Sequence, residues 1–312
     1  MERANAGPDE RQWLVEQFEQ CRPHLRAVAY RMLGSLTEAD DAVQDAWLRL
    51  SRSAGVDGID DLRAWLTTIV ARLCLNVLRS RAVRREDPIG LHVPDPLISF
   101  NDSLDPEQQA LLSDSVGLAL QVVLDTLEPS ERLAFVLHDM FEVPFDQIAP
   151  MVGSSVGAAR QMASRARRRV RGASPTPDEG LVAQRRVVDA FAAAAREGNF
   201  DALVAILHPN VIVRSDRGPT APPVLIRGAE AAAKAALEGA RGWTNVVLQP
   251  ALVNGAAGLA FFQGDNLFAV SAFSIAGSKV IEIDTITDPA RLQQFELTTT
   301  TYPNQPKEDR VQ

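Results

Sequence analysis

Apolar residues recur every three to four positions over most of residues 1–172, the period of α-helices that bury one face. The first clear repeat begins at Pro23 and ends at Gly34-Ser35. A second helix is expected to open at Thr37, where Thr37-Glu38-Ala39-Asp40 has the form of a capping box. A third is expected to begin near Leu62. The pattern predicts an all-α unit in this part of the chain.

The third helix has two distinguishable sides. We expect its core side to consist of apolar residues at helical spacing, namely Leu62, Trp65, Leu66, Ile69 and Leu73. Thr68, Arg72, Asn76 and Arg79 form a polar stripe, with Arg63 off the apolar seam and Arg81 at the end of the helix. Arginines and hydroxyls at this spacing suit the phosphates of a nucleic-acid strand, so all six are candidates for binding it. On the second helix, Asp41, Gln44 and Asp45 share one face at the spacing of helix neighbours, which is also the pattern of an ordinary solvated surface.

A helical repeat over Val116–Leu127 and another beginning at Glu128-Pro129 precede a helix-turn-helix pattern over Glu142–Arg171. A short helix that contains Pro150 is expected to kink there and to end at the turn residue Gly153. The next helix has a narrow apolar stripe formed by Val156, Ala159, Ala163, Ala166 and Val170. The polar side includes side chains that pair with bases or phosphates, and the candidates there are Ser155, Ala158, Arg160, Gln161, Ser164, Arg165 and Arg168. The pattern indicates a DNA-reading helix; a solvated surface helix is the alternative.

The pattern changes after residue 180. Helices are expected up to His208 and over Gly228–Gly239, and the alternation typical of strands begins at Val211–Val213. Four later strands are predicted at 246–253, 258–264, 267–275 and 280–287, and a final helix at 289–295. Helices followed by a strand meander indicate an α+β domain with a curved sheet wrapped on helices. The fold class is therefore multidomain, with two all-α units followed by an α+β unit.

Composition and charge restrict the possible partners. A chain of 312 residues is expected to form two or three domains. The formal charge is −8, from 32 basic and 40 acidic residues, so any DNA contact must come from local arginine patches rather than from net charge. Two cysteines without metal-ligand spacing, polar residues 1–12 and no long apolar run indicate a cytoplasmic protein with no signal peptide and no membrane partner.

Two stretches carry a family resemblance. DDAVQDAWLRL (40–50) and RAWLTTIVARLCLNVLRSR (63–81) resemble region 2 of the extracytoplasmic-function (ECF) sigma factors of bacterial RNA polymerase. Residues 115–171 resemble region 4 of the same family. The resemblance implies that Asp41, Gln44 and Asp45 dock on the β′ coiled coil of core polymerase, whose β subunit is a further partner. It also implies that the third helix holds the melted −10 element as single-stranded DNA, and that region 4 reads the −35 element as a duplex.

The rest of the chain resembles one branch of this family. Residues 87–106 hold four prolines and predict an extended connector. In sigma factors with an extra C-terminal domain, the connector carries a Trp-Leu-Pro-Glu-Pro motif that contacts that domain; His92, Val93, Pro94, Asp95 and Pro96 stand here. Residues 181–297 resemble the cone-shaped SnoaL-like domain, and the whole order resembles the SigJ-type subfamily, whose extra domain is a built-in regulator. Its Asp-Gly-Gly-Gly-Lys loop corresponds to Asp216, Arg217 and Gly218, without the lysine.

These observations predict a sigma factor with no catalytic residue, cofactor or metal. We expect region 2 at 1–86, a linker at 87–112, region 4 at 113–172, a second linker at 173–180, the regulatory domain at 181–297 and a disordered tail at 298–312. One alternative is a helix-turn-helix regulator that acts without polymerase. Another is an enzyme or small-ligand sensor in the C-terminal domain, whose pocket would bring together His208, Arg214, Asp216, Glu282 and Asp284. Glu282 and Asp284 also fit outward-facing strand positions.

Overall fold

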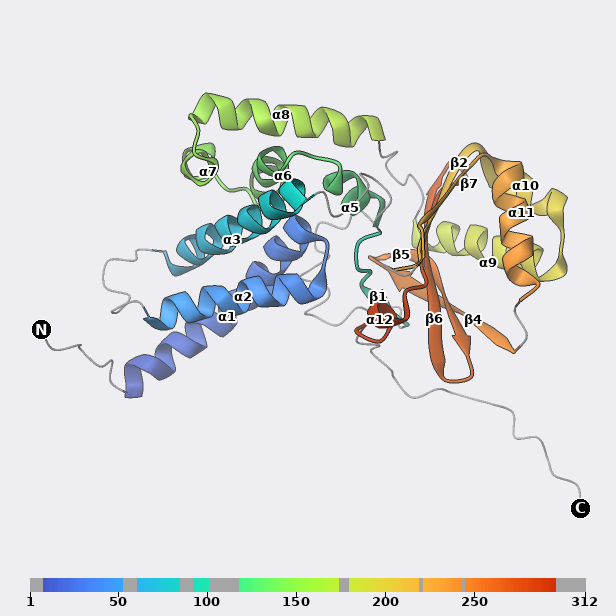
Figure 1. Cartoon of the computed structure of the whole chain (residues 1–312), viewed down its shortest axis with the longest axis horizontal. Coiled ribbons are helices and arrows are strands. Elements are labelled where there is room, and N and C mark those ends of the chain that lie inside the picture. The colour runs from blue at the N-terminus through green and yellow to red at the C-terminus, as the bar shows by residue number, and fades with distance from the viewer. Residues whose placement is uncertain are drawn as a thin grey trace, which may run out of the picture.

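A computed structural model of the chain describes residues 8–52, 61–84, 93–100, 118–173, 180–218, 221–242 and 245–295. His92, the expected tail and parts of both expected linkers lie outside the described residues. The described elements form a helical half and a sheet-containing half that lie side by side (Figure 1). This arrangement confirms the predicted fold class.

The first helical unit consists of three helices, α1 (Pro8–Leu33), α2 (Leu36–Arg52) and α3 (Leu62–Arg84). The start predicted for α1 at Pro23 is wrong, because the helix continues through this proline. An interior proline costs about 3 kcal/mol, while burying a large apolar side chain contributes about 1.5–3 kcal/mol. The buried side chains of Leu14 and Phe18 on the added turns are enough to offset the proline.

Two further details of this unit differ from the prediction. The start predicted at Thr37 is one residue late, and Ser35 is the residue whose hydroxyl faces the Glu38 N–H, at 3.5 Å. On α3, only Leu66 of the expected core side is fully buried. The helix is covered from two sides, by α1 and α2 and by the second helical unit, so its buried surface is wider and rotated. The fully buried apolar residues of α3 are Leu66, Val70, Ala71, Cys74, Leu75 and Leu78.

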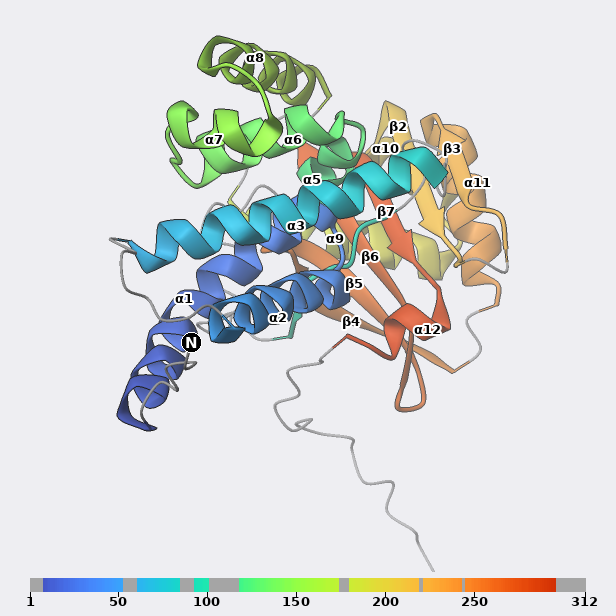
Figure 2. The ribbon, with the colours of Figure 1, turned by 60° about the vertical axis from the view of Figure 1, so that its left-hand side comes forward.

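The second helical unit packs on α3. Its elements are α5 (Leu118–Asp125), α6 (Pro129–Phe135), the π-helical segment η1 (Val136–Met140), α7 (Phe145–Val152) and α8 (Val156–Ala173). Pro150 lies inside α7 without ending it, and Gly153 closes that helix in the left-handed conformation at φ 70°. Figures 1 and 2 both show α8 on the outside of the molecule, with α6 and α7 between it and α3.

The sheet-containing half has seven strands in the order β1-β4-β5-β6-β7-β2-β3. The strands are β1 (Ile98–Ser99), β2 (Leu207–Asp216), β3 (Val224–Arg227), β4 (Val246–Val253), β5 (Ala256–Gln263), β6 (Asn266–Ala276) and β7 (Lys279–Ile286). The helices are α9 (Leu181–Glu197), α10 (Phe200–Ile206), α11 (Ala229–Ala240) and α12 (Pro289–Leu292). The four later strands were predicted within a few residues, whereas β2 is longer than predicted, α12 is shorter, and β1 and β3 were missed.

The two faces of the sheet have different neighbours. Alternate side chains such as Phe273 and Ile283 belong to a core shared with α9, α10 and α11. The opposite face packs against Val93 and Ile98 of the connector, Leu118 of α5 and the C-terminal residues around α12. In Figure 1, β1 and α12 lie on the side of the sheet that faces the helical half. The connector therefore supplies an edge strand, which pairs with Leu252–Val253.

Candidate nucleic-acid interface

The outer face of α8 presents a row of polar side chains. Ser155, Arg160, Gln161, Ser164, Arg165 and Arg168 are exposed, and Ala158 is half-buried. On the other side of the helix, Ala159, Ala163 and Ala166 have no exposed surface, because they pack against the helices beneath. The small alanine side chains let α8 lie close to α6 and α7 while its long polar side chains point to solvent. This arrangement suits insertion of α8 into a DNA groove.

Several arginines of α8 are already oriented by contacts within the unit. Arg167 donates two hydrogen bonds to Asp139, at 2.6 and 3.1 Å, and this carboxylate raises the pKa of the guanidinium. Arg165 and Arg169 lie 3.8 and 3.3 Å from Glu131. The Arg160 guanidinium lies 5.9 Å from the centre of the Phe145 ring. Arg167 is thus committed to a bidentate ion pair on the flank of the helix.

The polar stripe expected on α3 is present in part. Arg72, Asn76 and Arg79 are exposed at helical spacing, and Thr68 is half-buried with its hydroxyl donating to the Ala64 carbonyl at 3.0 Å. Arg81, by contrast, forms an ion pair with Glu38 of α2 and donates to the Leu33 carbonyl of α1. Arg81 therefore fastens the three helices together rather than extending the open stripe.

Arg63, at the start of α3, is tied to a histidine that sequence reasoning did not identify. Its guanidinium donates to His24 Nδ1 at 2.8 Å, and His24 Nε2 lies 3.2 Å from the Thr67 hydroxyl. That hydroxyl donates to the Arg63 carbonyl, so Nε2 carries the imidazole proton and donates to Thr67. Burial, helped by the Arg63 charge, lowers the pKa of His24 to about 4. The imidazole is neutral at pH 7, and its ring lies perpendicular to that of Phe141 in the second helical unit, with 5.3 Å between the ring centres.

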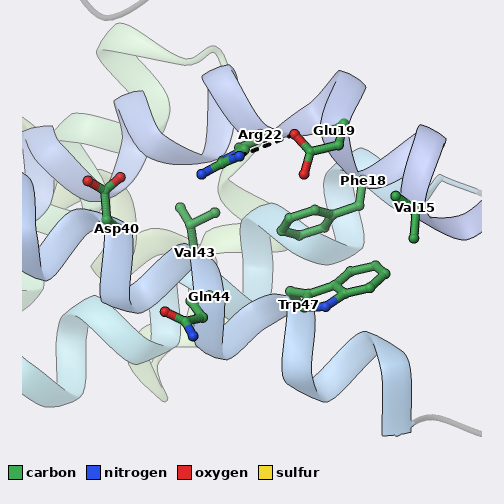
Figure 3. A pocket seen from close by; sticks show the side chains of 8 residues that line it. All are labelled: Val15, Phe18, Glu19, Arg22, Asp40, Val43, Gln44 and Trp47. Carbon is green, nitrogen blue, oxygen red and sulfur yellow. Dashed lines mark hydrogen bonds and ion pairs between the residues drawn. The ribbon is translucent and has the colours of Figure 1, made fainter.

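The acidic face of α2 borders an open groove. Asp41, Gln44 and Asp45 are all exposed. Figure 3 shows the groove between α1 and α2, a cavity of about 350 Å³. Its lining residues are Val15, Phe18, Glu19, Arg22, Asp40, Val43, Gln44 and Trp47. The Trp47 ring lies 5.0 Å from that of Phe18, so the groove has an apolar wall beside the carboxylates.

The connector is clamped to the sheet domain by one arginine. Arg291 of α12 donates to Asp95 Oδ1, at 2.9 and 2.6 Å, and to Asp216 Oδ2 at 2.7 Å. It also donates to the Val93 carbonyl at 2.6 Å, and the Val93 N–H donates to Asp216 at 3.3 Å. Asp216 accepts a further hydrogen bond from the Gly218 N–H, while Arg217 is exposed. Sequence reasoning named both aspartates and missed Arg291.

The other side of the connector contacts the end of α1. Val93 and the three residues Pro94–Pro96 are buried. The Asp95 N–H donates to the Gly34 carbonyl at 2.8 Å, and Asp95 Oδ2 accepts from the Leu36 N–H at 3.0 Å. The Tyr30 hydroxyl donates to the Asp95 carbonyl at 2.6 Å and accepts from Asn254 of the sheet domain at 3.0 Å. The connector thus touches both halves of the molecule at once.

Of the residues proposed for a C-terminal pocket, Arg214, Glu282 and Asp284 come together, and the other two have different partners. Arg214 pairs with Asp284 at 2.9 Å and with Glu282 at 3.1 Å, whereas Asp216 pairs with Arg291. The expectation that Glu282 and Asp284 point outward is wrong, since both are buried and burial raises the pKa of each carboxyl. Because Ile283 faces the helices α9–α11, its two neighbours lie on the opposite face of the sheet.

His208 is also separate from this cluster, at the start of β2, where its ring accepts from the Asn210 N–H. Within the described ranges, no three His, Cys, Asp or Glu side chains gather in a way that could hold a metal ion. Nor does any helix in these ranges combine the length and apolar character that crossing a bilayer requires.

Two family models match the helical half. Residues 17–84 match "Sigma-70 region 2" and residues 117–170 match "Sigma-70, region 4". The chain is 43% identical over 222 residues to the ECF RNA polymerase sigma factor SigJ of Mycobacterium tuberculosis, covering 69% of this chain and 70% of that protein. It is 37% identical over 278 residues to the probable ECF RNA polymerase sigma factor SigI of the same species, covering 87% and 92%.

A solved structure matches almost the whole fold. The crystal structure of M. tuberculosis SigJ superposes with a TM-score of 0.71 at 34% identity, covering 91% of this chain and 100% of that one. The match therefore extends beyond the two helical units into the sheet domain. The order of two sigma regions and a C-terminal sheet domain is the order expected from the sequence.

Proposed function

Because this chain belongs to the ECF sigma factors of bacterial RNA polymerase, we propose that α8 reads the −35 element and that α3 holds the melted −10 strand. As a sigma factor, it binds core polymerase and promoter DNA and directs transcription initiation. The observation that carries the assignment of sites is the exposed Arg-Gln-Ser face of α8 over a fully buried alanine stripe. It acts in the cytoplasm, where core polymerase works.

At the −35 duplex, the α8 residues divide into two roles. Gln161 and Arg160 carry the donor and acceptor groups that pair with base edges in the major groove. Arg165 and Arg168, nearer the end of the helix, suit phosphate contacts, which position the helix without reading sequence. Ser155 caps the start of α8 by accepting the Ala158 N–H at 3.2 Å, so its hydroxyl lies at the end of the helix that would enter the groove.

At the −10 element, the contacts are to one strand. Arg72, Asn76 and Arg79 lie along a single exposed side of α3 and track the backbone of unpaired DNA. Arg63 and Arg81 have weaker support for a direct role, because each is already tied to groups of the protein. The three exposed residues are therefore the core of the proposed −10 site, with Thr68 at its edge.

Core polymerase docks on α2 in this proposal. Asp41 and Asp45 supply negative charge, and the groove beside Gln44 supplies an apolar wall that contains Trp47. Such a mixed surface, an apolar centre with charged residues around it, is typical of protein–protein contacts. The partner surface would be basic with apolar residues, as expected for the β′ coiled coil.

The C-terminal domain regulates the sigma regions through the connector. Asp95 and Asp216 both pair with Arg291, whose positive charge lies between the two carboxylates. Positions −35 and −10 are about 25 base pairs apart, about 85 Å along B-DNA, yet α6 and α7 contact α3 directly. The docked arrangement cannot reach both elements, so region 4 must separate from region 2 before initiation.

We assign the units to 1–86 (region 2), 113–172 (region 4) and 181–297 (regulator), joined by linkers at 87–112 and 173–180. No catalytic role is proposed for the sheet domain. In its buried Arg214–Glu282–Asp284 cluster, the arginine forms ion pairs with both carboxylates. The cluster lies on the face of the sheet opposite α9–α11.

Co-purification with core polymerase tests the α2 site. Asp41→Arg and Asp45→Arg are expected to weaken binding by about tenfold or more, because each turns an attractive charge into a repulsive one. Glu230→Arg makes the same change of charge at an exposed position on α11 and is expected to bind as the parent does. Equal binding by all the variants would contradict the α2 site, and DNA binding without any polymerase association would favour a polymerase-independent regulator.

A further inference from the structure

The C-terminal end of α1 is contacted by three other segments, namely α3, the connector and region 4. The last carbonyls of a helix have no donor within the helix and need outside partners. We call Tyr30–Leu36 the α1 terminus. Its Leu33 carbonyl accepts from Arg81 of α3, and its Gly34 carbonyl accepts from the Asp95 N–H of the connector, at 3.2 and 2.8 Å.

Region 4 donates to two of the earlier carbonyls, of which that of Tyr30 also accepts from the Gly34 N–H at 2.8 Å. Gln121 of α5 donates to the Tyr30 and Arg31 carbonyls at 3.1 and 3.2 Å. Arg132 of α6 donates to the Arg31 carbonyl through Nε and Nη2, at 3.2 and 3.0 Å, and forms an ion pair with Asp125. Gln121 and Arg132 are 0% and 2% exposed. A cation buried at the negative end of a helix is well placed, so region 4 caps a helix of region 2.

Gly34 lies where region 4 and the connector meet. Its backbone is in the left-handed conformation, at φ +71°. A side-chain Cβ at this position would lie 3.4 Å from Pro94 of the connector and 3.5 Å from both Asp125 and Gln121 of region 4. A Cβ alone would therefore touch both segments at ordinary van der Waals distance. Side-chain atoms beyond Cβ would push on both of them.

We propose that the α1 terminus is an autoinhibitory latch, on which region 4 and the connector close together. Gln121 and Arg132 hold region 4 there, and Asp95, clamped by Arg291, holds the connector there. Because region 4 and the connector both pack beside Gly34, the docking of one favours the docking of the other. The sheet domain thereby helps to keep region 4 docked through a site that it reaches by way of the connector and Tyr30, in addition to its own contact with α5. This inference rests on the proposed regulatory role of the C-terminal domain.

The variant Gly34→Asn tests the latch in the full-length chain. Asparagine tolerates the left-handed conformation, so the change adds bulk with little backbone strain. Gly198→Asn is the matched control: Gly198 has the same φ of +71° but nothing within 4 Å of its Cβ position. Spin labels on Ser80→Cys of α3 and Arg171→Cys of α8, both exposed positions, report the separation of regions 2 and 4.

Labelling requires replacement of Cys21 with serine, while Cys74 can stay. Burial raises the pKa of the Cys74 thiol to about 12, which leaves it unreactive. We expect Gly34→Asn to raise the fraction of widely separated molecules roughly tenfold, and Gly198→Asn to give the parental distance distribution. Unchanged distances in a folded Gly34→Asn chain would overturn the latch.

Gln121→Leu provides a second route if Gly34→Asn fails to fold. It removes the two hydrogen bonds from Gln121 Nε2 to the Tyr30 and Arg31 carbonyls, while Arg132 still donates to the Arg31 carbonyl. It also removes an amide oxygen that is buried without a hydrogen-bond partner, so region 4 itself should remain folded. It is expected to raise the separated fraction by roughly fivefold, and no increase would contradict the proposal. If the label distances are unchanged in every variant and all of them still direct promoter-specific transcription, only the latch is rejected. The sigma function would remain supported.

Discussion

At the scale of single residues, the polar side chains that sequence reasoning missed are those whose partners are distant in the chain. Arg291 lies 196 positions from Asp95, and Arg132 lies 101 positions from Arg31. Helical or strand periodicity identifies which face a residue occupies, but a long-range ion pair leaves no periodic signal. Asp95 and Asp216 were identified because they stand at positions of family motifs. Arg291 and Arg132 belong to no such motif.

His24 gives a prediction at this scale. Its pKa in the folded chain is about 4, below the ordinary value of 6.5, because of burial and the Arg63 charge. The unfolded chain therefore binds more protons between these values, and the contribution to stability is present above pH 6.5 and is lost as the pH falls through this window. The free energy of unfolding should fall between about pH 7.5 and about pH 5, and this loss should be smaller in His24→Gln by on the order of 1–2 kcal/mol.

Urea unfolding of the full chain at both pH values measures this effect. If the free energy of unfolding falls by the same amount in the parent and in His24→Gln, the lowered pKa of His24 does not contribute to the pH dependence of stability.

At the scale of elements, the strands with long alternating patterns were predicted well and the short edge strands were not. The bounds of β4, Val246–Val253, agree with the prediction. β1 has two residues, too few to show a period, and exists only because Ile98 and Ser99 find the open edge of β4. The buried alanine stripe of α8 was correct because a helix-turn-helix must bring two helices close together.

Gln161 tests the assignment of α8 to the −35 element. In the assembled holoenzyme, Gln161→Ala should cost about 1–3 kcal/mol of binding to a promoter with its −35 element, because a base contact is lost. Arg167→Ala is the control on the same helix, since its guanidinium is occupied by Asp139, and should cost less than about 0.5 kcal/mol. The measurement is competition between intact and −35-scrambled promoter fragments. Equal discrimination by the parent and by Gln161→Ala would contradict the assignment.

At the scale of the whole molecule, the docking of the parts was beyond sequence reasoning. An apolar face must be covered, but its period does not say by what. The buried surface of α3 is wider than predicted, because region 4 packs on its second side. The connector was predicted to be extended and to contact the C-terminal domain; its described residues also contact the end of α1, which the sequence did not indicate. The acidic net charge of −8 fits a protein whose DNA contacts are local.

Run-off transcription with purified core polymerase and the full chain, comparing the parent with Arg291→Met, tests the central claim most directly. The account predicts a transcript that requires both the −35 and the −10 sequence. It also predicts several-fold more of it from Arg291→Met, because Asp95 and Asp216 then repel each other and the connector releases region 4. Equal transcript from both chains would contradict the regulatory clamp. No transcript from any template, including the region upstream of the protein's own gene, would contradict the account as a whole.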